Sequence, residues 1–163
     1  MKPADLLALL QDFYRDKLAL QRRHVAGARL VSSYEVNNTY QYILAREATH
    51  LEWLRAAITE LGAQIDDSGS EPAVPPVGKG KTGAIALLED DVRLAREFVA
   101  RWRDRVSQVT NARHRKMLEL AVGESSEHLR FFEQDVAGRP DLLGRRPETA
   151  GTGGGVLPTR WVE

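Results

Sequence analysis

Apolar residues recur every three or four positions through four long stretches of this 163-residue chain, which is the spacing of one face of an α-helix. No stretch alternates between apolar and polar residues as a half-buried strand would. Helices that are apolar on one side bury that side against one another. The sequence therefore predicts an all-α protein whose four helices run from about Pro3 to Ala28, Ser33 to Leu61, Gly83 to Gln108 and Ala112 to Val136.

Local signals support the ends of these helices. Pro3 suits a first helical turn, where its missing N–H would have no partner. Ser32 and Glu35 have the spacing of a capping box at the start of the second helix. Gly62 fits the end of that helix, and Asn111 is expected to cap the fourth.

Two segments lack helical periodicity. Residues 63–82 are rich in proline and glycine and are predicted to be a linker that crosses the end or the length of a bundle. Residues 138–163 are expected to form a flexible tail with a glycine run, after a bundle domain of residues 1–137. The short apolar end of that tail could dock on its own domain or on a partner; the other interpretation is a disordered tail with incidental apolar residues.

Composition excludes several classes of function. The chain has 23 basic and 23 acidic residues, so it gives no reason to expect nucleic-acid or membrane partners. No apolar run approaches the roughly 18 residues of a membrane span. The first residues lack the apolar core of a signal peptide, so we expect a cytoplasmic location. Without cysteine, thiol catalysis, disulfides and iron–sulfur clusters are excluded.

One sequence motif, Glu47-Ala48-Thr49-His50, places a carboxylate at the centre of the apolar stripe of the second helix. Burying an ionised carboxylate without a partner costs several kcal/mol or more, so Glu47 needs a partner. A metal ion is one candidate, and a Tyr, Arg or Lys side chain is another. His50 lies to one side of Glu47 on the same helix.

The second half of the chain repeats this pattern weakly. An offset of 77 positions aligns Glu47 with Glu124, and Tyr14 with Asp91, which lies on the apolar stripe of the third helix. Two helices joined by a short turn return to the same level after about 33 residues, which is the spacing from Tyr14 to Glu47 and from Asp91 to Glu124. We therefore expect these four positions to meet in the middle of the bundle.

Helical carboxylates combined with Glu-x-x-His motifs are typical of di-iron and di-manganese carboxylate bundles. The chain from about Ala4 to Val136 resembles the ferritin-like superfamily, and residues 47–62 resemble the second helix of its rubrerythrin-like branch. The resemblance implies an antiparallel four-helix bundle made of two helical hairpins joined by a long crossover linker. It also implies a metal centre that binds one or two iron or manganese ions.

The ligand set that the resemblance implies is altered in this chain. Glu47 and Glu124 would bridge, while His50 and Asp91 would be terminal ligands. The first helix has Tyr14 where the family has Glu, and Tyr14 would supply either a phenolate or a hydrogen bond to Glu47. In the fourth helix Glu127 stands at the expected histidine position and His128 follows it, so either could face the site. The full list of candidate metal ligands is Glu47, His50, Asp91, Glu124, Glu127 and His128.

The implied activity is redox chemistry on iron, peroxide or dioxygen. Because the chain has no cysteine, electrons would come from a separate donor protein or from the metal itself. Haem is not expected, since a core role suits Met117 better than ligation. A homodimer is a further expectation. The alternative is a metal-free bundle that acts as a structural or protein-interaction module, with Tyr14 bonded to Glu47 and His50 paired with Asp91. His24 and His114 are expected at the surface or at hairpin ends.

Overall fold

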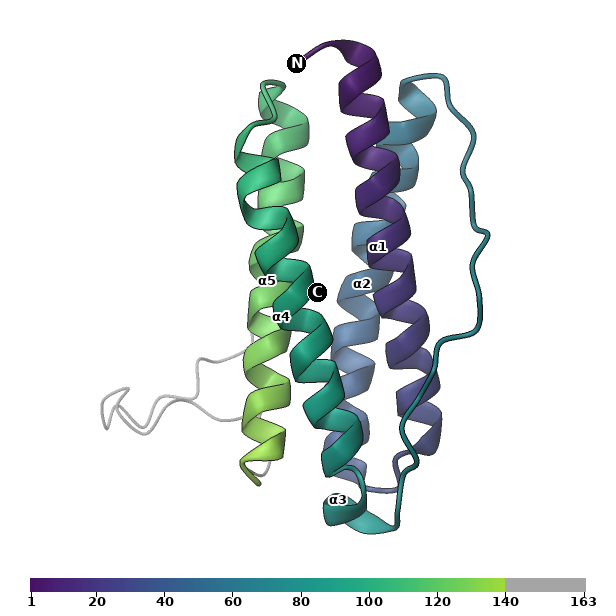
Figure 1. The fold of residues 1–163 in the computed structure, drawn as a ribbon, viewed down its shortest axis with the longest axis vertical. Helices are drawn as coiled ribbons and strands as arrows, with labels where there is room; N and C mark the ends of the chain where they lie inside the picture. Colours follow the sequence, from purple (N-terminus) through teal and green to yellow (C-terminus); the bar gives the residue numbers. More distant parts are fainter. Residues whose placement is uncertain (140–163) are drawn as a thin grey trace, which may run out of the picture.

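A computed structural model describes residues 1–139, apart from the side chain of Lys81, and these residues form five helices and no strand. The helices are α1 (Pro3–Leu30), α2 (Tyr34–Glu60), α3 (Gly80–Gly83), α4 (Ile85–Ser107) and α5 (Ala112–Val136). The four long helices pack together as a bundle, with α1 beside α2 and α4 beside α5 (Figure 1). The prediction of an all-α four-helix bundle is confirmed. The predicted docking segment of the tail lies outside the described residues.

Buried residues follow one another along each long helix at alternating spacings of three and four. This 3.5-residue repeat keeps one seam of a helix against its neighbours over many turns. On α1 and α2 the seam positions are Leu10, Phe13, Lys17, Leu20, His24 and Gly27, then Val36, Tyr40, Ile43, Glu47, His50, Leu54 and Ala57. On α4 and α5 they are Leu88, Asp91, Ala95, Phe98 and Trp102, then His114, Leu118, Ala121, Ser125, His128, Phe132 and Asp135.

Two apolar clusters form the core, and a polar layer separates them. One cluster takes residues 6–20 of α1, 51–58 of α2, 98–109 around the end of α4 and 118–122 of α5. The other takes Ala28, residues 36–43 of α2, residues 84–88 and Phe132. We define the polar layer as the buried seam residues between them: Lys17, His24, Glu47, His50, Asp91, Ser125 and His128.

The helix ends match the sequence signals in three of four cases. Pro3 begins α1, and Gly62 follows α2 with a φ of 82°, which glycine adopts without strain. The side chain of Asn111 accepts a hydrogen bond from the backbone N of His114 at 3.1 Å and so caps α5. The predicted capping box of α2 is wrong. The helix begins one residue later, and the Oγ of Ser32 accepts a hydrogen bond from the backbone N of Gly80 instead.

The segment between α2 and α4 runs along the outside of the bundle (Figure 1). The predicted linker ended at Thr82, whereas the structure places the one-turn helix α3 over Gly80–Gly83. Val74 and Val77 pack against the second core cluster, so the segment is held by apolar contacts as well as by its ends. None of the helices in residues 1–139 combines the length and apolar character needed to cross a membrane.

Candidate functional site

The polar layer gathers most of the candidate ligands, but it does not arrange them as one centre. Glu47, His50 and Asp91 are fully buried, and His128 is almost so. Glu124 is half-buried at the edge of the layer, with 17% of its side chain exposed. Glu127 is exposed. Of the two alternatives in the fourth helix, His128 therefore faces the interior of the bundle and Glu127 faces solvent.

A lysine of α1 forms an ion pair with Glu47. Nζ of Lys17 lies 3.0 Å from Oε1 of Glu47, and both side chains are fully buried. The same ammonium donates to the Oγ of Ser125 at 3.0 Å, and that hydroxyl donates to the backbone O of Ala121 at 2.7 Å. It also lies 5.2 Å from the ring centroid of Phe98, within cation–π range. Lys17 thus links α1 to α2 and α5 through the centre of the bundle.

His24 completes the surroundings of Glu47. Its Nδ1 lies 2.9 Å from Oε2 of Glu47, so each carboxylate oxygen has its own donor from α1. Burial by itself would raise the pKa of the Glu47 carboxyl. Attraction to His24 and Lys17 outweighs burial and holds that pKa well below its usual range. Glu47 is accordingly an anion whose charge is balanced by protein side chains.

Glu124 forms a second pairing at the edge of the polar layer. Arg46 donates to both of its oxygens, at 2.9 and 2.6 Å, and His50 donates from Nε2 at 2.8 Å. The bidentate bond from Arg46 lowers the pKa of Glu124, and His50 adds to this. Burial, reinforced by the nearby charge of Lys17, lowers the pKa of His50 to about 4, and the opposing effects of Glu124 and Glu47 are smaller than these two together. His50 is therefore neutral at physiological pH.

His128 stands next to His50 without a hydrogen bond. The two rings are stacked, with centroids 6.5 Å apart. Neither nitrogen of His128 has a hydrogen-bond partner among the described residues, and the same is true of Nδ1 of His50. Burial and the charge of Lys17 lower the pKa of His128 to about 3. The layer thus holds uncharged imidazole nitrogens beside a paired lysine and glutamate.

Asp91 belongs to a separate network. Tyr40 donates its hydroxyl hydrogen to Oδ2 of Asp91, and the guanidinium of Arg23 lies 3.4 Å from Oδ1. Arg23 also donates to Asp90 at 3.2 Å. Burial raises the pKa of Asp91, although His24 and Arg23 oppose the change. The predicted pairing of His50 with Asp91 is therefore wrong, since His50 pairs with Glu124.

Tyr14 also has a different partner from the one expected. Its hydroxyl donates to Asp67 in the segment after α2, and burial together with this bond raises its pKa to about 12. Arg55 donates to the same carboxylate at 3.0 Å. The predicted bond from Tyr14 to Glu47 is wrong, because Lys17 and His24 hold both oxygens of Glu47.

These pairings bear directly on a metal centre. Lys17 takes one oxygen of Glu47, Arg46 takes both oxygens of Glu124, and Asp91 lies in another network. No group of three or more His, Asp or Glu side chains in residues 1–139 is placed to hold a metal ion. As they are arranged here, the candidate ligands do not fit the di-metal centre that the resemblance implied.

Several residues of the site were not found from the sequence. Lys17, Arg23 and Arg46 were not singled out. His24 and His114 were expected at the surface or at hairpin ends; both are buried, and His114 does lie at a hairpin end, in the first turn of α5. One sequence signal could have found Lys17 and His24. Both stand in register with Leu10, Phe13 and Leu20 at alternating spacings of four and three, so they occupy the same seam.

Comparisons with protein-family models, with curated proteins and with solved structures found no match to this chain.

Proposed function

We propose that this chain is a metal-free helical bundle that acts as a structural or protein-interaction module, with Lys17 supplying the positive charge that a metal ion would supply in a ferritin-like centre. One observation carries the proposal. Nζ of Lys17 lies 3.0 Å from Oε1 of Glu47, with both groups fully buried. A buried carboxylate needs a cation, and here the chain provides it.

A ferritin-like ancestry fits this proposal. The pairing of α1 with α2 and of α4 with α5, and the long segment beside the bundle, suit two antiparallel hairpins joined by a crossover linker (Figure 1). In such a bundle an internal lysine would preserve the packing of the polar layer after loss of the metal. A cytoplasmic location belongs to the same proposal.

Metal analysis tests this function. Protein from cells grown with added iron or manganese, and protein reconstituted with Fe²⁺ or Mn²⁺, is expected to hold far less than one ion per chain. Chelator is expected to leave its melting temperature unchanged. The matched variant Lys17→Glu replaces the internal cation with a carboxylate, so we expect it to be unstable alone and to gain stability from added Mn²⁺. Stoichiometric metal in the unmodified protein would overturn the proposal.

A second candidate is the metal-binding function itself, an oxidoreductase acting on iron, peroxide or dioxygen. Its support is the set of buried imidazole nitrogens without a partner among the described residues, on His50 and His128 beside Glu47 and Glu124. It requires Lys17 to leave Glu47. The same metal analysis decides it, and only a metal-loaded protein would justify a search for its electron donor or for a homodimeric form.

A further inference from the structure

A cavity of about 600 Å³ opens between α1, α4 and the Pro72–Pro75 part of the segment after α2. It is larger than two other hollows beside α1, which measure about 150 and 280 Å³. Much of its wall is apolar, from Leu20 on α1, Val74 on the outer segment, and Leu94 and Phe98 on α4. The cavity thus has the size and lining of sites that enclose an apolar group as large as an indole.

The charged groups at the rim of this cavity are already paired with one another. Arg101 lies 2.8 Å from Asp16. Arg93 lies 2.7 Å from Asp90 and 2.9 Å from Glu97. These pairs leave the apolar wall as the feature that an occupant can use, and an occupant gains by removing that wall from water. The occupant must therefore bring apolar surface of its own.

One apolar segment of the chain lies beyond the residues that the structure describes. Residues 156–162 read Val-Leu-Pro-Thr-Arg-Trp-Val, with a single charge, and we call them the tail segment. Trp161 is its largest side chain. A tryptophan side chain buries roughly 150–250 Å² when it is enclosed, so this residue would dominate the energetics of docking such a short segment.

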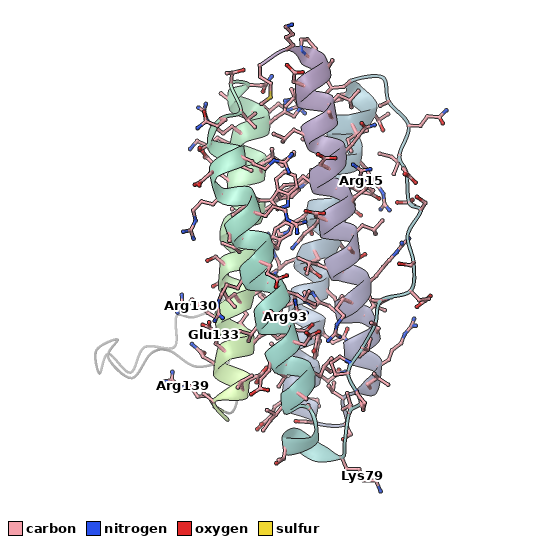
Figure 2. The ribbon with its side chains drawn as sticks, viewed as in Figure 1. Arg15, Lys79, Arg93, Arg130, Glu133 and Arg139 are labelled. Atoms are coloured by element: carbon pink, nitrogen blue, oxygen red, sulfur yellow. The ribbon has the colours of Figure 1, made fainter. Side chains whose placement is uncertain are left out.

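The tail begins close to the level of the cavity. Figure 2 shows Arg139, the last described residue, at the end of α5, in the same half of the bundle as Arg93, which lines the cavity. Glu133 of α5 lies 2.8 Å from Arg96 of α4, and α5 ends at Val136, about 5 Å farther along the axis. The tail therefore leaves the bundle next to α4, and another side of that helix lines the cavity.

Residues 140–155 are long enough to join the end of α5 to the cavity. The route passes half-way round α4, about 17 Å for a helix about 10–12 Å wide, and about 10 Å back along it. Five of these sixteen residues are glycine. A glycine-rich stretch of sixteen residues spans about 20–24 Å on average and more than about 50 Å when extended. The route is thus close to the average span and well within the maximum.

This match of lengths favours the chain's own tail over a segment from a second molecule. A linker whose average span matches the distance between two sites gives an effective concentration of about millimolar. The tail segment then occupies the cavity even if its affinity is only about millimolar. A segment on a second copy has no such advantage, because it meets the cavity at the concentration of the protein.

We propose that the tail segment of this chain docks in the cavity, with the indole of Trp161 against Leu20, Leu94 and Phe98. The docked segment covers the groove between α1 and α4 and closes it to other ligands. The docking goes beyond the proposed function and does not depend on whether the polar layer binds metal.

A spin label tests this docking in the full chain. Because the chain has no cysteine, Thr159→Cys gives one attachment site for a nitroxide, and that site lies within the tail segment. In isotope-labelled protein the nitroxide is expected to broaden the amide signals of Leu20, Leu94 and Phe98. It should spare the amide signal of Arg46, whose side chain bridges α2 and α5 on the other side of the bundle.

Two pairs of variants identify the contact. Trp161→Ser is expected to abolish the broadening, whereas Leu143→Ser, outside the tail segment, should keep it. Ala19 lines the cavity from an exposed position of α1, so Ala19→Trp fills it and should also abolish the broadening. Ala100→Trp makes the same change at an exposed position of α4 outside the cavity and should keep it.

A mixed sample distinguishes the chain's own tail from that of a second copy. Isotope-labelled protein without the nitroxide is mixed with unlabelled protein that carries it, and no broadening is expected. The proposal is overturned if the three cavity signals are not broadened in the first sample, if Arg46 is broadened as much, or if the effect appears in the mixed sample. It is also overturned if the broadening survives Trp161→Ser or Ala19→Trp.

Discussion

The ammonium group of Lys17 and the carboxylate of Glu47 meet at 3.0 Å in the middle of the bundle, and neither side chain reaches solvent. Removing charges from water costs several kcal/mol for each ion, and the attraction between them offsets this cost only while both are present. The pair therefore adds little to stability as a unit but makes each residue dependent on the other.

Lys17→Met is expected to lower the free energy of unfolding by about 3–5 kcal/mol, because it leaves Glu47 buried with only His24 as a close partner. The double variant Lys17→Met/Glu47→Met removes both charges with little change in volume, so it should regain most of the loss. Urea denaturation of the two single variants and the double variant measures the coupling. If the double variant lost as much free energy of unfolding as the two single variants added together, Lys17 and Glu47 would not depend on each other.

Stability is expected to fall as the pH drops from 7 toward 4. His50 and His128 have folded-state pKa values of about 4 and about 3, below the ordinary value of about 6.5 that they regain on unfolding. Between these values the unfolded chain binds protons that the folded chain does not, so acid favours unfolding by about 1.4 kcal/mol per pH unit for each histidine.

Thermal melts at several pH values measure this slope. His128→Leu removes one of the two groups without removing any hydrogen bond found for His128 within residues 1–139, so the slope should become shallower. A slope unchanged in that variant would show that His128 does not contribute.

Tyr40→Phe should destabilise the protein by about 1–3 kcal/mol, because Asp91 loses the hydroxyl that donates to its buried carboxylate. Tyr34→Phe is the matched control, since the side chain of Tyr34 is 79% exposed. The control should change stability by less than about 0.5 kcal/mol. Equal effects of the two variants in urea denaturation would argue against a role for the Tyr40–Asp91 bond.

Two helical glycines should respond to alanine in opposite ways. A Cβ at Gly27 would lie 3.1 Å from the hydroxyl oxygen of Tyr40, where the ring is held by its bond to Asp91. Gly27→Ala is therefore expected to destabilise by about 1–3 kcal/mol through overpacking. A Cβ at Gly123 meets nothing within 4 Å, so Gly123→Ala should stabilise α5 by up to about 1 kcal/mol. Melting temperatures of both variants, measured side by side, test the contrast.

The fold was largely predictable because apolar periodicity is read directly from residue type. The fourth helix was predicted as Ala112 to Val136 and is observed with those ends. The same periodicity predicted that Glu47, His50 and Asp91 face the core, and all three are buried. Their role as metal ligands stays a prediction.

The partners of Glu47 were harder to predict, because they depend on where the first turn lies. Helix α1 continues to Leu30, two residues past the expected end, so the turn is centred on Ser32. Lys17 and Glu47 are each fifteen residues from that centre and therefore lie at the same level. Tyr14 lies almost a turn farther along α1. Lysine is also rarely found inside a protein, so its residue type did not mark Lys17 as a core position.

A seam made only of Leu, Ile and Val can slide by seven residues and still bury apolar surface. The polar layer removes that freedom, since it lies between two apolar clusters. If α1 shifted by one heptad against α2, Lys17 would face the level of Tyr40 or Leu54, and Glu47 would lose its cation. Such a shift would leave two buried charges unpaired. The internal ion pair thus favours one register of α1 against α2 over registers shifted by a heptad.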